Sequence, residues 1–84
     1  MFEILLERSA EKDLKRLAHE IRPKVIAAIK TLGEEPRPPG CRKLVGEEND
    51  WRIRVGDYRV IYEIADEIRI VRITRIRHRK DVYR

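Results

Sequence analysis

The sequence predicts an α+β domain in which an N-terminal strand and a two-helix hairpin precede an antiparallel meander of three to four strands. Three observations predict it. The apolar residues recur with a helical period between residues 10 and 32 and with a period of two beyond residue 51. A run rich in proline and glycine, residues 33–40, separates the two patterns. The chain has 84 residues, which is enough for one hydrophobic core, so we expect residues 1–84 to form a single domain.

The first two elements are a strand and a helix. Residues 2–7 are short and mostly apolar, which favours a strand. Ser9 is a residue type that often caps helix N-termini, and acidic residues follow it in the expected first turn. The next apolar positions are spaced as one helical stripe: Ala10, Leu14, Leu17, Ala18 and Ile21. We therefore expect a helix from Ser9 to about Ile21.

A second helix is predicted to begin at Pro23, because a proline in the first turn loses no intrahelical hydrogen bond. Its buried face would consist of Val25, Ile26, Ile29 and Leu32, and Gly33 would close it. Neither helix can bury its apolar stripe alone, so the pair is expected to cover one face of a sheet. The proline-rich run would carry the chain from the helices to that sheet.

The meander begins with a clear alternation, which places Ile53 and Val55 on one strand face and Arg52 and Arg54 on the other. Gly56 and Asp57 offer a two-residue turn, after which residues 58–64 return as the partner strand. Residues 65–67 turn again, and residues 68–76 form the last long strand. The apolar residues of that strand do not alternate strictly. Burial on both faces and a β-bulge each explain the slip, and the sequence does not choose between them. The face opposite the helices is expected to be open and lined by arginine.

The positive charge is concentrated in the C-terminal part of the chain. The net charge is +5, and residues 1–50 carry ten basic and ten acidic residues. Residues 51–84 carry ten basic residues, nine of them arginine, against five acidic ones. Because guanidinium groups stay charged and bind phosphate oxygens in a planar fork, the excess suits a phosphate-binding surface. From charge alone, a solvated basic face that keeps a small protein soluble remains an equal alternative.

Several classes of protein are excluded by composition. Cys41 is the single cysteine, so the chain forms no internal disulfide, and with two histidines it cannot build a four-ligand zinc site from Cys and His. Glutamates interrupt the apolar N-terminus, which excludes a signal-peptide core, and no run reaches membrane-spanning length. We expect a cytoplasmic protein without a metal or other cofactor and without a membrane partner.

Two motifs resemble the RelE/ParE superfamily of type II toxin–antitoxin systems. They are W-R-I-R-V-G-D-Y-R-V-I-Y at residues 51–62 and R-H-R-K-D-V-Y at residues 77–83, and Lys43-Leu44 precedes them. The order of the expected elements matches as well, so the similarity covers essentially the entire chain. The resemblance implies a RelE-like fold.

The resemblance also implies an activity. Superfamily members that cut mRNA in the ribosomal A site carry two basic residues on the first hairpin strand and an arginine on the second. They also carry an arginine and a tyrosine near the C-terminus. By motif, these positions fall on Arg52, Arg54, Arg59, Arg77 and Tyr83. The gyrase-directed ParE branch generally lacks this set, so the resemblance favours a ribosome-dependent endoribonuclease. In that reaction a ribose 2′-OH attacks the adjacent phosphate, and the arginines would stabilise the anionic phosphorane.

The sequence offers few groups for proton transfer. Some relatives have lysines where this chain has Arg52 and Arg54, and arginine is a poor base. Tyr83 is the preferred general base, because nearby guanidiniums favour the phenolate. His78 is the alternative, since imidazole titrates near neutral pH. His78, Arg79 and Lys80 are expected to bind RNA. Trp51 would either stack on a base or simply fill the edge of the sheet.

The implied partners are the ribosome with its mRNA and a cognate antitoxin with an acidic, partly disordered segment. Two other functions remain open at this point. One is a ParE-like inhibitor of DNA gyrase that acts by binding alone. The other is a non-catalytic partner whose basic face serves toxin–antitoxin assembly or operator DNA binding.

Overall fold

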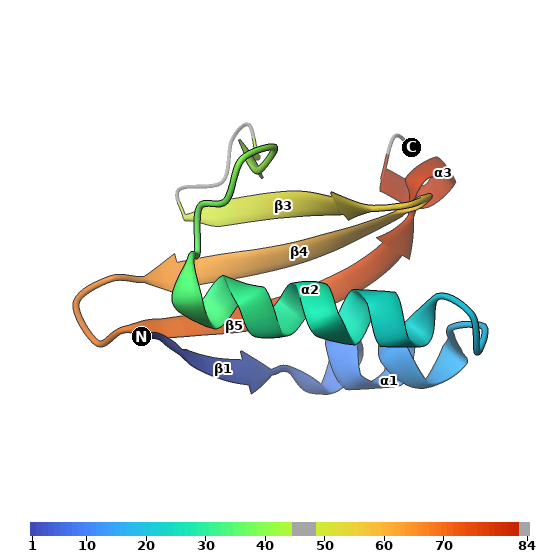
Figure 1. Cartoon of the computed structure of the whole chain (residues 1–84), viewed down its shortest axis with the longest axis horizontal. Helices are drawn as coiled ribbons and strands as arrows, with labels where there is room; N and C mark the ends of the chain where they lie inside the picture. The colour runs from blue at the N-terminus through green and yellow to red at the C-terminus, as the bar shows by residue number, and fades with distance from the viewer. Residues whose placement is uncertain (45–48, 83–84) are drawn as a thin grey trace.

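The computed structural model describes residues 1–44 and 49–82, which form a five-stranded sheet with three helices (Figure 1). The elements in chain order are β1 (Glu3–Leu6), α1 (Arg8–Arg16), α2 (Arg22–Glu34), β2 (Arg42–Lys43), β3 (Asp50–Val55), β4 (Tyr58–Ala65), β5 (Ile70–His78) and α3 (Arg79–Val82). This is the predicted α+β fold. None of the helices in the described part is long and apolar enough to cross a membrane.

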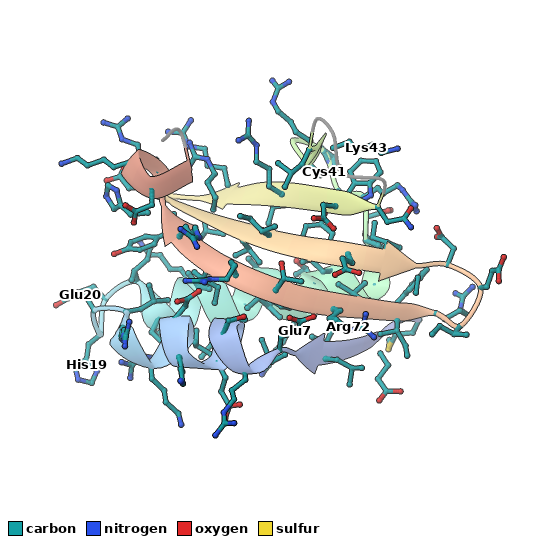
Figure 2. All side chains as sticks on the ribbon, turned by 180° about the vertical axis from the view of Figure 1, so that it is seen from behind. Glu7, His19, Glu20, Cys41, Lys43 and Arg72 are labelled. Atoms are coloured by element: carbon teal, nitrogen blue, oxygen red, sulfur yellow. The ribbon has the colours of Figure 1, made fainter. Side chains whose placement is uncertain are left out.

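The strand order across the sheet is β1-β5-β4-β3-β2. From β2 to β5, each strand pairs with the next in antiparallel orientation, which confirms the predicted meander, with four strands. β1 pairs with β5 in parallel orientation, so the sheet is mixed. In Figure 1, α2 lies in front of the sheet and α1 follows β1 along the side of β5. The opposite face is turned toward the viewer in Figure 2, and no helix of residues 1–44 and 49–82 lies across it.

The predicted limits of the first helix are wrong at both ends. α1 begins at Arg8, so Ser9 is not its cap, and the Ser9 hydroxyl instead donates to the carbonyl of Thr74 at 2.7 Å. The helix ends at Arg16, five residues before Ile21. Its final carbonyl groups accept hydrogen bonds from the guanidinium of Arg22, which bonds to the oxygens of Leu14, Lys15 and Leu17. A distant side chain therefore satisfies the helix terminus, and the apolar stripe continues into a turn.

α2 contains Pro23 in its first turn, as predicted, and extends one residue past Gly33. The Gly33 carbonyl accepts a hydrogen bond of 2.7 Å from the Phe2 amide. A Cβ at position 33 would lie 3.0 Å from the Phe2 oxygen, so the helix can approach β1 closely because glycine stands there. Ile26 is only partly buried, whereas the other three predicted residues of the buried face are in the core. The core comprises Ala10, Leu17, Val25, Ile29, Leu32, Ile53, Val60, Tyr62, Ile64, Val71, Ile73 and Ile76.

The hairpin between β3 and β4 has the predicted two-residue turn. Gly56 has φ of 60°, a value that glycine adopts without strain, and Val55 is paired with Tyr58 across the turn. This pairing fixes which residues of the two strands lie opposite each other. Ile53 is buried and Arg54 is exposed, as the alternation predicts.

The predicted limits of the last strand are wrong, because β5 runs from Ile70 to His78 rather than from residue 68 to residue 76. Arg69 has φ of 54° and belongs to the turn that precedes the strand. The broken alternation is explained by a bulge. Ile61 is paired with Arg75 and Tyr62 with Ile73, so Thr74 is an extra residue in β5. The sequence did not predict α3, which follows β5 directly.

Candidate nucleic-acid interface on the open face of the sheet

Three of the predicted site arginines form one row across three neighbouring strands. Arg54 on β3 is the Cα partner of Arg59 on β4, and Arg59 is the partner of Arg77 on β5. Residues directly opposite each other in a sheet project to the same face. Arg54, Arg59 and Arg77, here called the arginine row, therefore lie together on the open face.

The guanidinium groups of Arg54 and Arg59 converge at the β3–β4 turn. Nε of Arg54 donates to the Gly56 carbonyl at 3.2 Å, and Nη1 of Arg59 donates to the same oxygen at 3.4 Å. Arg59 also donates to the Tyr58 carbonyl at 3.1 Å. Arg59, the middle member of the row, is only 8% exposed, and the backbone carbonyls of the turn hold its guanidinium in place. A buried guanidinium with only neutral carbonyl partners retains its full charge for an anion.

A hollow of about 310 Å³ lies over this part of the sheet, lined by Gly40, Arg42, Arg52, Arg54 and Arg59. Arg52 thus joins Arg54 and Arg59, as the motif implied. Arg42 was missed at the sequence level. It belongs to β2, a strand of two residues in which Arg42 is the partner of Arg52. The adjacent pair Arg42-Lys43 was the one signal for it, and so short a strand has no readable period.

Two other arginines of the sheet, Arg72 and Arg75, differ from the arginine row in having acidic partners. Arg72 lies 3.7 Å from a carboxylate oxygen of Glu63 and 3.9 Å from one of Glu7. Arg75 pairs with Asp13 at 2.9 Å. Within residues 1–44 and 49–82, by contrast, no carboxylate lies within 4.0 Å of the guanidinium of Arg54, Arg59 or Arg77. Neighbouring like charges without counter-charges favour binding of an anion between them.

Arg77 and His78 border a second hollow of about 310 Å³ between the end of β5, α1 and α3. His78 is the Cα partner of Tyr58, and their rings meet edge to face with centroids 5.3 Å apart. Nδ1 of His78 accepts a hydrogen bond of 3.3 Å from the Lys80 amide. Because successive strand residues alternate, Arg77 and His78 leave β5 on opposite faces. Neither of them lines the first hollow, which Arg52, Arg54 and Arg59 share.

α3 brings two further basic residues to the same end of the molecule. Arg79 and Lys80 are exposed, and the Arg79 amide donates to the Asp57 carbonyl at 2.7 Å. This bond holds α3 beside the β3–β4 turn, where Figure 1 shows it. Arg79 and Lys80 therefore extend the basic surface beyond the arginine row.

Trp51 is not part of this cluster. It shares a strand face with Ile53 and packs against the hydrophobic core. The guanidinium of Arg37 lies over its ring at 5.1 Å from the centroid, a cation–π contact. The structure thus places Trp51 on the face opposite the arginines.

The tyrosine expected at the site, Tyr83, lies outside the described residues. Tyr62 is not a substitute for it, because its side chain is fully buried and its hydroxyl donates to the Pro36 carbonyl at 2.7 Å. Burial raises the pKa of the Tyr62 phenol well above its ordinary value, which disfavours the phenolate that a general base needs.

Comparison with known proteins identifies the family. The family described as the ParE toxin of type II toxin–antitoxin system, parDE, matches residues 4–83. The chain belongs to this toxin family, within the RelE/ParE superfamily. The toxin is 36% identical to toxin RelG of Mycobacterium tuberculosis over 84 residues, which cover 90% of this chain and 88% of that protein.

Solved structures agree with this assignment. One is the toxin–antitoxin complex RelBE2 of Mycobacterium tuberculosis, with a TM-score of 0.82, 29% identity and coverage of 92% of this toxin and 96% of that chain. Another is the archaeal RelE–RelB complex of Pyrococcus horikoshii, with a TM-score of 0.82, 25% identity and coverage of 93% and 94%. The family and the RelE-like fold implied by the two sequence motifs are therefore confirmed.

Proposed function

We propose that this toxin is a ribosome-dependent mRNA endoribonuclease that inhibits translation by cutting mRNA in the A site. The observation that carries the proposal is the arginine row, in which three guanidiniums share one face and have no carboxylate partner among the described residues. Toxins named RelG and RelE3 are similar to this chain over most of its length. A toxin with this substrate acts in the cytoplasm.

The proposed reaction is attack of a ribose 2′-OH on the adjacent phosphate, which expels the 5′-oxygen of the next nucleotide and leaves a 2′,3′-cyclic phosphate. The phosphorane gains negative charge on its equatorial oxygens in the transition state. Arg54, Arg59 and Arg77 would hold those oxygens more tightly than they hold the ground-state phosphate. Because Arg59 is fixed by the turn, little reorganisation is needed when the charge develops.

Proton transfer is assigned to Tyr83 as general base, with His78 as the alternative. The arginines cannot serve, since guanidinium does not lose its proton in proteins. His78 lies directly after Arg77 in β5 and borders the same hollow as Arg77, so it stays the alternative base. Such a small set of acid–base groups suits an enzyme whose substrate is oriented by the ribosome.

The remaining basic residues would hold the RNA backbone on either side of the scissile phosphate. Arg52 and Arg42 line the same hollow as Arg54 and Arg59. Arg79 and Lys80 are exposed on α3, which is bonded to the β3–β4 turn. Contacts of this kind are electrostatic and independent of sequence. They would position the mRNA without selecting its bases.

We also propose a cognate antitoxin as the partner of this toxin, since two of the similar solved structures are toxin–antitoxin complexes. The uncompensated charge at the hairpin end fits an acidic, partly disordered antitoxin segment. An antitoxin bound there would cover the arginine row and prevent access of RNA.

One observation favours a second candidate, inhibition of DNA gyrase by binding. The matching family is described as the ParE toxin, and the ParE branch is the gyrase-directed one. In that case the arginine row would contact a protein or DNA surface without cleavage chemistry.

The two functions are separated by mapping mRNA 5′ ends on translating ribosomes and by assaying gyrase supercoiling with the same protein. The nuclease proposal predicts new ends within A-site codons, their loss with Arg77→Ala and Tyr83→Phe, and normal supercoiling. Retention of cleavage by His78→Gln would support Tyr83 as the base. Intact mRNA together with inhibited supercoiling would reject the nuclease and select the gyrase-directed function.

A further inference from the structure

The strand that carries Arg77 loses its neighbour halfway along its length. β1 pairs with β5 only from Ile70 to Ile73, and the last bond between them joins the Glu7 amide to the Ile73 carbonyl at 2.9 Å. Beyond that point the outer side of β5 faces α1 instead of a strand. A strand end that is paired on one side alone is free to fray or shift unless other groups hold it.

The bulge lies at this same point and decides where Arg77 projects. Ile73 and Ile76 are both buried in the core although they are three residues apart, which strict alternation forbids. The extra residue, Thr74, restores the register, so that Arg77 lies opposite Arg59. If β5 continued without the bulge, Arg77 would lie opposite Tyr58 and project into the core side of the sheet.

Two side chains of α1 hold the bulge. The Ser9 hydroxyl donates to the Thr74 carbonyl at 2.7 Å. Oδ2 of Asp13 accepts the Ile76 amide at 3.0 Å, and the Asp13 carboxylate also accepts two bonds from the Arg75 guanidinium, at 2.9 and 3.2 Å. The Asp13 side chain is only 12% exposed, so these bonds are largely shielded from water. Asp13 thus accepts a backbone hydrogen bond at the end of β5, where a neighbouring strand would otherwise do so.

We infer that Asp13, assisted by Ser9, is a positioning residue that holds the bulged end of β5 and thereby keeps Arg77 in line with Arg59 and Arg54. Asp13 also keeps the guanidinium of Arg75 turned toward α1 by pairing with it. The effect on catalysis rests on the proposed nuclease function, whereas the effect on the geometry of Arg77 does not.

Glu11 provides a matched control for the Asp13 variant. Both are acidic residues of α1, but Glu11 is exposed, and among the described residues its ion pair is with Lys15 of the same helix, at 3.9 Å. Glu11→Gln therefore removes the same charge from the same helix without touching β5. Asp13→Asn keeps the size of the side chain and weakens its bonds to Ile76 and Arg75.

The test compares wild type, Asp13→Asn, Ser9→Ala and Glu11→Gln by amide hydrogen exchange and by titration with pyrophosphate, followed at the arginine Nε–Hε resonances. In Asp13→Asn we expect the Ile76 amide to exchange about tenfold or more faster, because the closed state of the strand end is less populated. The chemical-shift change of the Arg77 Nε–Hε resonance on addition of pyrophosphate should become smaller, while that of Arg59 should persist. Ser9→Ala should produce smaller changes of the same kind, and Glu11→Gln none.

Cleavage on ribosomes adds a kinetic measurement. Asp13→Asn should lower kcat about tenfold with little change in KM, since misplacing a transition-state group by a fraction of an ångström costs rate rather than binding. A normal pyrophosphate response of Arg77 with normal kcat would overturn the inference, even if the variant were less stable. If Asp13→Asn does not fold, Ser9→Ala decides by the same two measurements. Absence of cleavage by wild type would reject the nuclease proposal alone, because the exchange and pyrophosphate measurements would still decide the role of Asp13.

Discussion

The two ends of the open sheet face differ in how their charges are paired. Near the β4–β5 loop, Arg72 lies between Glu7 and Glu63, and Figure 2 shows Glu7 and Arg72 side by side at the edge of the sheet. A further pair, at 2.9 Å, joins Asp66 to Arg37, which lies over Trp51 on the opposite side of the sheet. At the hairpin end, the arginine row has no such partner among the described residues.

We interpret this difference as one between arginines paired within the fold and arginines available to bind an anionic ligand. A paired arginine at the surface contributes little beyond local order. Three arginines on one face, with no carboxylate partner among the described residues, repel one another, and binding of an anion would offset that repulsion. For the proposed site, the lack of a counter-ion among the described residues is therefore a more specific criterion than the number of arginines.

The largest effect should come from removing a member of the arginine row. Arg77→Gln is expected to lower the single-turnover rate of mRNA cleavage about 100-fold or more, as loss of one transition-state donor does. Arg72→Gln, on the same strand and face, should change the rate less than about threefold, because its partners are structural carboxylates. Equal losses in the two variants would show that general basicity, and not the unpaired row, carries the activity.

The next effect concerns the stability of the fold around the buried hydroxyl of Tyr62. Tyr62→Phe removes the hydroxyl that donates to the Pro36 carbonyl and leaves that acceptor without its partner in a buried region. We expect a loss of about 1–3 kcal/mol in the free energy of unfolding, measured by urea denaturation. The cleavage rate should stay unchanged when measured well below the melting temperature. A loss of rate without loss of stability would instead give Tyr62 a role in the site.

The smallest effect is a pH-dependent one at Asp66. Its hydrogen bond to Arg37 lowers the pKa of the Asp66 carboxyl, so ionised Asp66 stabilises the folded state. That contribution is present above the unfolded pKa of about 3.9 and is lost as the pH falls through the lower folded value. The melting temperature of Asp66→Asn should therefore be slightly lower than that of wild type at pH 7. Near pH 2 the two melting temperatures should be equal. A difference that persists at the lower pH would mean that the pair stabilises through something other than charge.

The sequence predicted the elements well where their pattern was local. The alternation of residues 51–55 and the Gly56-Asp57 turn were enough to place Arg54 opposite Arg59, because a two-residue turn fixes the register of a hairpin. The two motifs at residues 51–62 and 77–83 also identified the superfamily. The sequence did not predict that β1 pairs with β5, because a short apolar strand carries no pattern that identifies its neighbour in the sheet.

The errors arose where distant residues decide local structure. α1 ends early, and the guanidinium of Arg22 bonds to its last carbonyl groups. Ser9 does not cap the helix, because its hydroxyl donates to the Thr74 carbonyl in the bulge. The position of Arg77 depends on that bulge, whose site is set by contacts with α1. The inclusion of Arg42 depends on β2, which is too short to have a period.

The most direct test of the account is a double-mutant cycle on Arg54 and Arg77, the outer members of the row. Single-turnover cleavage of A-site mRNA is measured for wild type, Arg54→Gln, Arg77→Gln and the double variant. If both guanidiniums bind one scissile phosphate, the double variant should lose clearly less than the product of the two single losses, a coupling of about 0.5–3 kcal/mol. Losses that simply multiply would place the two arginines on separate parts of the RNA and contradict the account.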